Sequence, residues 1–318
     1  MKRNILITSV GRRVELIEAF VEAANSLCNS EVFGTDMNPE MSSAGRFVSS
    51  CFIVPRANAN GYIDELLEIC EDHKIGLIIP TLDTELLALA QNQELFNKAG
   101  VSVVISDLEL VSKCRDKRLT SILFTELKIP IPKELDLTGK EFPIFGKPIS
   151  GSLSQGLVTI KNKSEITDEI LSKKDEMVFM EYISPSHYDE YTIDAYYDKN
   201  SECKCLVPRR RIEVRGGEIS KGITNKGPIY SDLVRLLNHV KGARGVLTIQ
   251  VFAHKKTGHL KGIEINPRFG GGFPLSNAAG AKYAEYIVKE YILDQQIDFH
   301  DQWKDKLKMT RYDKAIYF

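Results

Sequence analysis

The first hundred residues alternate short apolar runs with stretches of helical periodicity, and this alternation constrains the fold more than any other feature of the chain. The apolar runs lie at residues 5–8, 31–35, 52–54, 76–79 and 101–105, and the helical stretches lie at 14–27, 62–71 and 85–96. Strands that alternate with helices of this length form a parallel sheet with helices on both faces. We therefore expect residues 1–108 to form a small doubly wound α/β domain.

In doubly wound sheets, ligands bind to the loops at the carboxyl ends of the strands. Here these loops are residues 9–12, 35–36 and 80–83. The first loop holds a single glycine, Gly11, and lacks the G-x-G-x-x-G motif, which argues against a dinucleotide site. We expect the loops to face a substrate; the alternative is that Gly11 only turns the chain into its first helix.

Beyond residue 108 the pattern changes to α+β with an antiparallel sheet. Strand patterns occur at 157–160, 178–182, 191–197, 204–208, 247–253 and 260–265, and helices are expected at 110–127, 229–239 and 279–291. A chain of 318 residues can form two or three packed units and can fold without disulfides or metals.

Composition and charge argue against several classes of protein. The net charge is -1, so no overall field draws the chain to nucleic acid or to an anionic membrane. The six cysteines form no C-x-x-C pair, so we expect reduced cysteines in a cytoplasmic protein. The sequence shows no signal-peptide pattern and no run of about 18 apolar residues, so we expect no membrane span.

The segment with the most informative chemistry is Glu264-Ile265-Asn266-Pro267-Arg268. Side chains alternate along a strand, so Glu264, Asn266 and Arg268 share one face. A carboxylate beside an amide oxygen suits Mg²⁺, and an arginine can hold a phosphoryl oxygen. Gln250 lies on the preceding predicted strand, which a hairpin can place beside Glu264. The alternative is a solvated strand face, which the glycine run that follows disfavours.

Two lysines are candidates for phosphate binding. Lys117 stands at a helix start, and Lys147 lies on a strand before a loop of small residues. Small residues let backbone N–H groups approach a phosphate closely. Those of the loop are Ser150, Gly151, Ser152, Ser154 and Gly156. A P-loop is excluded because Gly139 and Gly146 are separated by six residues and Pro148 follows the lysine. For either lysine the alternative is a solvated side chain.

Acidic residues near strand ends are weaker candidates. Glu181 ends an apolar strand and, with Tyr182 and Ile183, can offer a carboxylate and backbone groups to an adenine edge. Glu190 can accept hydrogen bonds from ribose hydroxyls. Taken alone, acidic residues at such positions are usually only solvated.

Taken in order, these elements resemble the ATP-grasp superfamily, most of all the carbamoyl phosphate synthase large subunit and stand-alone carboxylate–amine ligases. The order is Asp116-Lys117, Phe145-Gly146-Lys147-Pro148, the small-residue loop, Met180-Glu181-Tyr182-Ile183, Glu190, Gln250 and Glu264-x-Asn266-Pro267-Arg268. The resemblance covers nearly the whole chain and implies a Rossmann-like pre-ATP-grasp domain at 1–108 followed by a two-part ATP-grasp fold. The two parts would be a small lid subdomain at 109–180 and a metal- and ATP-binding subdomain at 181–318.

The resemblance also implies roles in binding ATP. Lys117 and Lys147 would contact the α- and β-phosphates, and residues 150–156 would cover the γ-phosphate. Residues 181–183 would line the adenine, and Glu190 would hold the ribose. The loop lacks the basic residue that many members carry, so its contact with the γ-phosphate would rest on backbone and serine donors.

The metal and transfer roles follow from the same resemblance. Gln250, Glu264 and Asn266 would hold two Mg²⁺ ions, with Mn²⁺ as a substitute, and Glu264 would bridge the ions. Arg268 would stabilise the transferring phosphoryl group and the acyl phosphate.

Three consecutive arginines, residues 209–211, are not explained by nucleotide binding. The net charge and the absence of interleaved aromatic residues argue against a nucleic-acid patch. Strand alternation places Arg209 and Arg211 on one face and Arg210 on the other. Arg211 is our candidate for binding the substrate carboxylate, and a surface ion pair is the alternative.

We therefore expect an ATP-dependent ligase that activates a small carboxylate as an acyl phosphate for attack by an amine, releasing ADP and phosphate. One alternative is a carbamoyl-phosphate-synthase-like kinase of bicarbonate or carbamate, which with a single ATP-grasp unit would need a partner. The other is a non-catalytic nucleotide-binding module. We expect small-molecule substrates, and a homodimer is common in the family.

Overall fold

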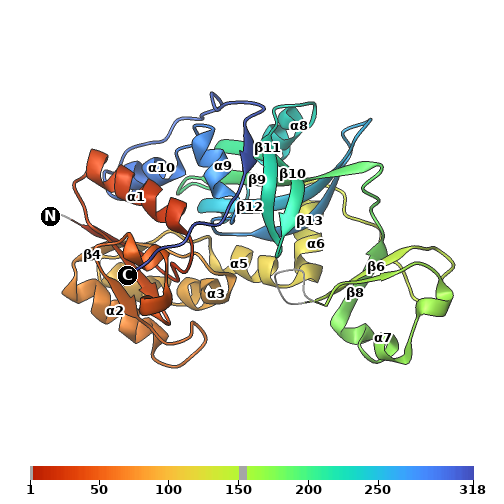
Figure 1. Ribbon diagram of the computed structural model, residues 1–318, viewed down its shortest axis with the longest axis horizontal. Helices are drawn as coiled ribbons and strands as arrows, with labels where there is room; N and C mark the ends of the chain where they lie inside the picture. The colour runs from red at the N-terminus through yellow and green to blue at the C-terminus, as the bar shows by residue number, and fades with distance from the viewer. Residues whose placement is uncertain (1–2, 150–155) are drawn as a thin grey trace.

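The computed structural model describes residues 3–149 and 156–318 of the chain (Figure 1). These residues form a five-stranded, a six-stranded and a three-stranded sheet. The six-stranded sheet lies between the N-terminal five-stranded sheet and the three-stranded sheet, which projects to one side (Figure 1). The expected domain boundaries at 108 and 180 stay predictions.

The N-terminal strands form a parallel sheet in the order β3-β2-β1-β4-β5, as expected of a doubly wound domain. Its strands are β1 Asn4–Ile7, β2 Val32–Asp36, β3 Cys51–Ile53, β4 Ile75–Ile79 and β5 Ser102–Val103. The helices are α1 Val14–Leu27, α2 Tyr62–Asp72, α3 Asp83–Gln91 and α4 Gln93–Lys98, with short 3-10 turns at Pro39–Met41 and Ala44–Arg46. Ile5 and Ile7 pack against α1 while Leu6 packs against α2 and α3, so both faces of β1 are buried.

Two helices predicted as continuous are each divided in two. The stretch 85–96 forms α3 and α4, which meet at Asn92, and the stretch 110–127 forms α5 Leu108–Arg115 and α6 Lys117–Glu126. The second break lies at Asp116, whose backbone is extended and whose carboxylate accepts from the backbone N–H of Arg118 at 2.8 Å. An aspartate in this conformation caps a new helix, and Lys117 becomes its first residue.

The three-stranded sheet forms a small unit of its own in the order β7-β6-β8. Its strands are β6 Ile144–Pro148, β7 Val158–Ile160 and β8 Met177–Glu181, and the helices between β7 and β8 are η3 Lys163–Glu165, α7 Asp168–Ser172 and η4 Lys174–Glu176. Ile144, Ile160 and Phe179 form its core. At Gly146 a Cβ would lie 2.7 Å from Val158 and 2.8 Å from the Phe179 ring, so the residue before Lys147 has no room for a side chain.

The six-stranded sheet is antiparallel in the order β13-β12-β9-β10-β11-β14. Its strands are β9 Tyr188–Tyr197, β10 Cys203–Arg215, β11 Glu218–Thr224, β12 Gly245–His254, β13 Leu260–Asn266 and β14 Lys308–Thr310. Helix α8 Ile229–Leu236 and helix α6 cover one face through a core that includes Ile193, Leu247 and Ile249. The opposite face packs against helices α9 Phe273–Ala278 and α10 Tyr283–Tyr291.

The helix predicted at 279–291 begins later than expected. Helix α9 spans Phe273–Ala278 and helix α10 spans Tyr283–Tyr291. Gly280 separates them with a φ of +107°, a conformation that L side chains rarely adopt and that no helix contains. Glycine at this position therefore ends one helix and sets the start of the next.

Two further observations bear on the composition. All six cysteines are free, and burial raises the pKa of Cys51 to about 11 and that of Cys70 to about 12. Within residues 3–149 and 156–318, none of the helices is both long and apolar enough to cross a membrane.

Candidate active site

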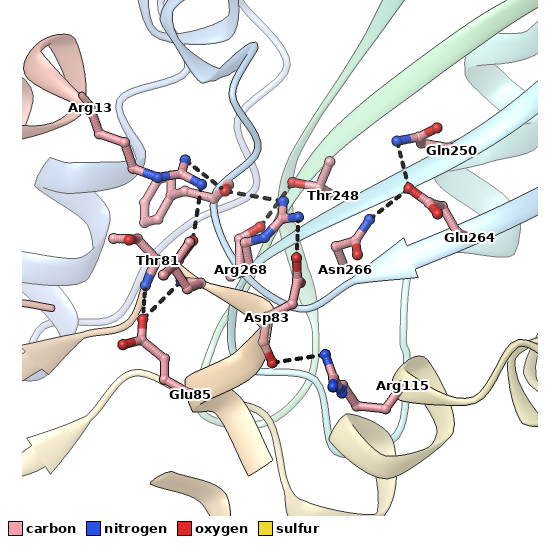
Figure 2. Close-up of polar contacts among 12 residues, drawn as sticks. Arg13, Thr81, Asp83, Glu85, Arg115, Thr248, Gln250, Glu264, Asn266 and Arg268 are labelled. Carbon is pink, nitrogen blue, oxygen red and sulfur yellow. Dashed lines mark hydrogen bonds and ion pairs between the residues drawn. The ribbon is translucent and has the colours of Figure 1, made fainter. Parts of the chain in front are cut away.

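The hairpin of β12 and β13 brings the predicted metal-binding residues together. Gln250 and Glu264 are direct neighbours in the strand register, and Thr248 pairs with Asn266 in the same way. One oxygen of Glu264, Oε1, accepts hydrogen bonds from Gln250 Nε2 at 2.9 Å and from Asn266 Nδ2 at 3.0 Å (Figure 2). One carboxylate with two amide neighbours is therefore assembled on a single face of the sheet.

This set is poor in carboxylates. Within the described part of the chain, no group of three or more His, Cys, Asp and Glu side chains is arranged to hold a metal ion. A site with a single carboxylate neutralises only half the charge of a divalent cation. Such a site suits Mg²⁺ that shares substrate phosphates and keeps waters, rather than a tightly held structural ion.

Both predicted phosphate-binding lysines lie close to Glu264. Lys147 is 8% exposed, and its Nζ donates to the backbone carbonyl of Ile263 at 3.2 Å. Burial lowers the pKa of Lys147 to about 8, with Glu264 opposing the change and Lys117 adding to it. The pKa of Lys117 is also lowered, chiefly by burial. Two cations held beside one carboxylate in a partly dry site form a position that favours an anionic ligand.

A cleft between α3, the α5–α6 break and the end of β13 joins these groups. Lys117, Glu264 and Asn266 line it together with residues of the N-terminal unit. The full lining is Asp83, Leu86, Val111, Cys114, Arg115, Lys117, Thr120, Glu264, Asn266 and Pro267. The cleft therefore lies between the parallel sheet and the six-stranded sheet.

Arg268 lies at the edge of this cleft and is held by the N-terminal unit. Its Nη2 donates to Asp83 Oδ2 at 2.7 Å, and its Nη1 donates to the carbonyl of Phe269 at 3.3 Å (Figure 2). The two side chains are only 15% and 19% exposed. The Nε atom of Arg268 is buried and has no hydrogen-bond partner among the described residues.

The loop that carries Asp83 is fixed by a buried glutamate. Glu85 has no exposed surface and accepts from the backbone N–H groups of Thr81 at 2.7 Å and Leu82 at 2.8 Å. Its other oxygen accepts from Ser9 Oγ at 2.9 Å and from Tyr62 Oη at 2.8 Å. The predicted ligand-facing loops 9–12 and 80–83 are therefore tied together. Asp83 was not singled out in the sequence, although its place after β4 was the available signal.

Arg211 lies on the same face as the metal-binding residues. It donates from Nη1 to Gln250 Oε1 at 3.2 Å and forms an ion pair with Glu190 at 3.1 Å. Its side chain is mostly buried, so the contact is not a surface ion pair. Partial burial raises the pKa of Glu190. The positive charge of Arg211 acts against this increase, and the negative charge of Glu264 adds to it.

The neighbouring arginines have different surroundings. Arg209 is 1% exposed and forms two 2.8 Å hydrogen bonds with the buried Asp194, which also accepts from Ser276 at 2.5 Å. Arg210 points to the opposite face and contacts Asp189. Arg209 and Arg211 thus lie on one face of the sheet and Arg210 on the other, as strand alternation predicted. Of the three, only Arg211 contacts Gln250.

The predicted adenine segment follows β8. The carboxylate of Glu181 accepts from the backbone N–H of Lys133 at 2.7 Å and contacts the ammonium group of Lys261 on β13. The N–H of Tyr182 donates to Pro143 at 3.2 Å, and Ile183 is buried. Of the predicted phosphate loop, Gly156 is described and has a φ of +70°; Ser150, Gly151, Ser152 and Ser154 lie outside the described residues.

Two family descriptions match separate parts of the chain. Residues 5–104 match the family described as PylC-like, N-terminal domain. Residues 173–315 match the family described as ATP-grasp in the biosynthetic pathway with Ter operon. No curated protein sequence matches the chain.

Solved structures of similar fold extend over nearly the whole chain. The biotin carboxylase domain of 2-oxoglutarate carboxylase from Hydrogenobacter thermophilus, in complex with MgADP, ADP and bicarbonate, has a TM-score of 0.74 at 12% identity and covers 97% of this chain and 74% of its own. N5-carboxyaminoimidazole synthetase from Staphylococcus aureus, complexed with ADP, has a TM-score of 0.70 at 14% identity, with coverages of 91% and 77%. L-amino acid ligase from Bacillus licheniformis has a TM-score of 0.68 at 16% identity, with coverages of 92% and 74%.

These findings agree with one another. The family matches and the shared architecture identify an ATP-grasp fold with a PylC-like N-terminal domain, and the predicted resemblance to the ATP-grasp superfamily is confirmed.

Proposed function

We propose that the chain is a magnesium-dependent ligase that uses ATP to activate a small carboxylate as an acyl phosphate for attack by an amine. The observation that carries this proposal is a cleft lined by Lys117, Glu264 and Asn266. Gln250 and Lys147 lie beside Glu264, and Arg268 is held by Asp83 of the same lining. Further support comes from ADP in the structures of two enzymes of similar fold. We also propose that 109–180 is the lid and 181–318 the main ATP-binding part.

In this proposal the lysines bind the α- and β-phosphates of ATP. Burial lowers the pKa of Lys147 more than Glu264 raises it, so a nearby negative charge would favour its ammonium form. A polyphosphate would supply the missing negative charge, so binding is favoured most where Lys117 and Lys147 meet. Residues 150–156 would cover the γ-phosphate, and residues 181–183 would line the adenine. Glu190 would release its ion pair with Arg211 and accept a hydrogen bond from a ribose hydroxyl instead.

The donor set fits Mg²⁺ bound together with nucleotide. Glu264 has a second oxygen besides the one that its amide neighbours use, and Gln250 and Asn266 each carry an amide oxygen. In this proposal Glu264, Gln250 and Asn266 would hold two Mg²⁺ ions, for which Mn²⁺ would substitute. When bound, the metal neutralises phosphate charge that builds up during transfer.

The reaction itself needs positioning rather than a side-chain nucleophile. A carboxylate oxygen attacks the γ-phosphorus, the bond to the β-phosphate oxygen breaks, and ADP leaves. The amine then attacks the acyl carbon, loses a proton, and displaces inorganic phosphate. In this proposal Arg268, held by Asp83, contacts the transferring group, and Arg211, beside Gln250, holds the substrate carboxylate.

A second candidate is phosphorylation of bicarbonate. It is favoured by the similar fold of a biotin carboxylase domain whose structure contains bicarbonate together with MgADP. The two candidates share the nucleotide and metal chemistry and differ only in the acid, so one assay can separate them.

The test is an ADP-release screen in which carboxylates are paired with amines, with bicarbonate plus ammonia as one arm. Wild-type protein should release ADP with at least one pair. Glu264→Ala should abolish this release and keep the same unfolding curve, whereas Glu169→Ala, at an exposed glutamate of α7, should change neither. ADP release by Glu264→Ala at the wild-type rate would refute the metal assignment, and ATP binding without ADP release across the panel would favour a non-catalytic module.

A further inference from the structure

A second hollow lies on the other side of Arg268, and nothing in the proposed nucleotide chemistry uses it. It is formed by the start of α1, strand β11, the loop after β13 and the segment after β14. The residues that matter here are Arg12, Arg13, Glu218, Gly270, Gly271 and Arg311. We call this site the arginine hollow.

The arginine hollow adjoins the reaction centre through a shared carbonyl. Arg13 Nη1 donates to the carbonyl of Phe269 at 3.2 Å, and Arg268 Nη1 donates to the same oxygen at 3.3 Å (Figure 2). Arg13 Nη2 also donates to the carbonyl of Thr81 at 3.0 Å (Figure 2). The arginine hollow is thus linked to Arg268 through Arg13 and one backbone carbonyl. The proposed function has Arg268 contact the transferring phosphoryl group.

The hollow concentrates positive charge in a chain whose net charge is -1. Arg12, Arg13 and Arg311 line it, against two carboxylates, Glu15 and Glu218. Glu218 is shared, because it pairs with Arg12 at 3.3 Å and with Arg311 at 3.1 Å. One carboxylate that bridges two arginines leaves guanidinium donors for a further anion.

Arg12 and Arg311 do not serve mainly to pack the core. Arg12 belongs to the first loop of the N-terminal unit and is 74% exposed, so its side chain contributes little to the core. Arg311 follows β14, and the segment after it returns to the N-terminal unit (Figure 1). There the guanidinium group of Arg46 lies 3.8 Å from the centre of the Phe318 ring. The two arginines come from distant parts of the chain and meet only at Glu218.

The floor of the hollow is bare backbone. A Cβ on Gly271 would lie 2.8 Å from the Glu218 carboxyl carbon, so a side chain there would displace the glutamate. Small residues at 270 and 271 keep the space beside Glu218 open and let a ligand approach the chain directly.

We propose that the arginine hollow binds a second anionic group, a carboxylate or a phosphate ester, on the acid that is activated at Arg268. Arg12 and Arg311 exchange Glu218 for this group, and Glu218 acts as an internal competitor that neutralises them when no ligand is bound. The acid is therefore at least a dianion. This inference rests on the proposed function and names the substrate class of the same site.

The experiment measures binding and ADP release with three probes that differ in their second group: succinate, 3-phosphoglycerate and propionate. Wild-type protein should bind succinate or 3-phosphoglycerate more tightly than propionate in isothermal titration. Arg12→Gln and Arg311→Gln should each weaken that binding about tenfold or more, the loss of one charge-assisted contact. Arg235→Gln, at an exposed arginine of α8, should leave it unchanged.

Glu218→Gln gives the sharpest arm, because a structural ion pair and an internal competitor predict opposite results. Removal of the competitor should tighten binding of the dianion several-fold, whereas a purely structural glutamate would give weaker or equal binding. Equal binding of all three probes by wild-type protein, or no gain with Glu218→Gln, would overturn the proposal. Dianion binding with no ADP release across the whole carboxylate–amine panel would refute the ligase function and leave the hollow standing. ADP release that is unchanged in Arg12→Gln and Arg311→Gln would refute the hollow and leave the ligase function standing.

Discussion

Lys147→Met should stabilise the protein without nucleotide while it weakens ATP binding. Burial lowers the pKa of Lys147 from 10.5 to about 8, which corresponds to about 3 kcal/mol by which the folded protein disfavours the charge at neutral pH. The variant also loses the 3.2 Å hydrogen bond to the carbonyl of Ile263, which contributes about 1 kcal/mol. The net gain expected for the variant at pH 7 is therefore about 2 kcal/mol in the free energy of unfolding.

The pH dependence of this gain has a definite sign. Below about pH 8 both the folded and the unfolded chain carry the charge of Lys147, so the wild-type protein bears the full cost. Between pH 8 and 10.5 the unfolded chain keeps the proton that the folded chain has released, so wild-type stability rises with pH relative to the variant. The advantage of the variant should thus fall below about 1 kcal/mol at pH 9.5.

Urea unfolding at pH 7 and pH 9.5 measures both quantities, with Lys161→Met, at the exposed residue that follows β7, as the control. Titration calorimetry with Mg-ATP should show binding weakened about tenfold or more in Lys147→Met. In wild-type protein, binding near pH 8 should take up about half a proton, because phosphate raises the pKa of the lysine again. A variant less stable than wild type at pH 7, or nucleotide binding without proton uptake, would refute the reasoning.

Three further predictions concern the scaffold of the site. Asp83→Asn removes the charged partner of Arg268 and should lower the maximal rate of ADP release about tenfold, with a smaller change in the ATP KM, which steady-state kinetics would check. Gly262→Ala puts a Cβ 2.5 Å from the Phe124 ring and should cost about 1–3 kcal/mol in urea unfolding; a neutral effect would contradict the packing. Asp194→Asn breaks the buried pair with Arg209 and should cost about 3–5 kcal/mol, visible as a lower Tm, while a wild-type Tm would show that the pair contributes nothing.

The parts of the fold that repeat a local rule could be predicted from sequence. The strand at Ile5, Leu6 and Ile7 is apolar throughout because helices cover both of its faces, and a parallel sheet follows from that pattern. The pairing of Gln250 with Glu264 was also accessible, because two strands joined by a short turn must lie side by side. In both cases the residues that determine the structure are near neighbours in the chain.

Single residues that interrupt a pattern were harder to interpret. Lys117 was expected at a helix start, but the periodicity also predicted one helix through Asp116. The structure shows the break, because the Asp116 carboxylate accepts from the N–H of Arg118 and caps a new helix that begins at Lys117. Gly280 likewise lies within an apolar periodic stretch, and only its positive φ shows that the helix cannot pass through it. The periodicity of apolar residues indicates which face of a helix is buried. It does not indicate at which residue one helix ends and the next begins.

Contacts between the two sheets lay beyond the reach of sequence patterns. Asp83 and Arg268 are brought together by the packing of the N-terminal unit on the six-stranded sheet. Nothing in the sequence around either residue indicates that the other is its partner. The same holds for the meeting of Arg12 and Arg311 at Glu218. The sequence indicated that the loop at 80–83 would face a ligand, and the structure adds that its aspartate holds an arginine of the site.

The arginines of β10 show what the alternation of side chains along a strand can and cannot predict. Alternation correctly assigns Arg209 and Arg211 to one face, but their surroundings depend on how far along the strand helix α9 reaches. At Arg209 the helix supplies Ser276 to the buried Asp194, and the guanidinium group is enclosed. Two residues further on, Arg211 contacts Gln250 and Glu190 instead, and Glu190 is 33% exposed. This partial exposure is why we propose a ligand role for Arg211 and none for Arg209. A strand pattern therefore gives the side on which a functional residue lies, and the packing of the next layer determines whether it can act.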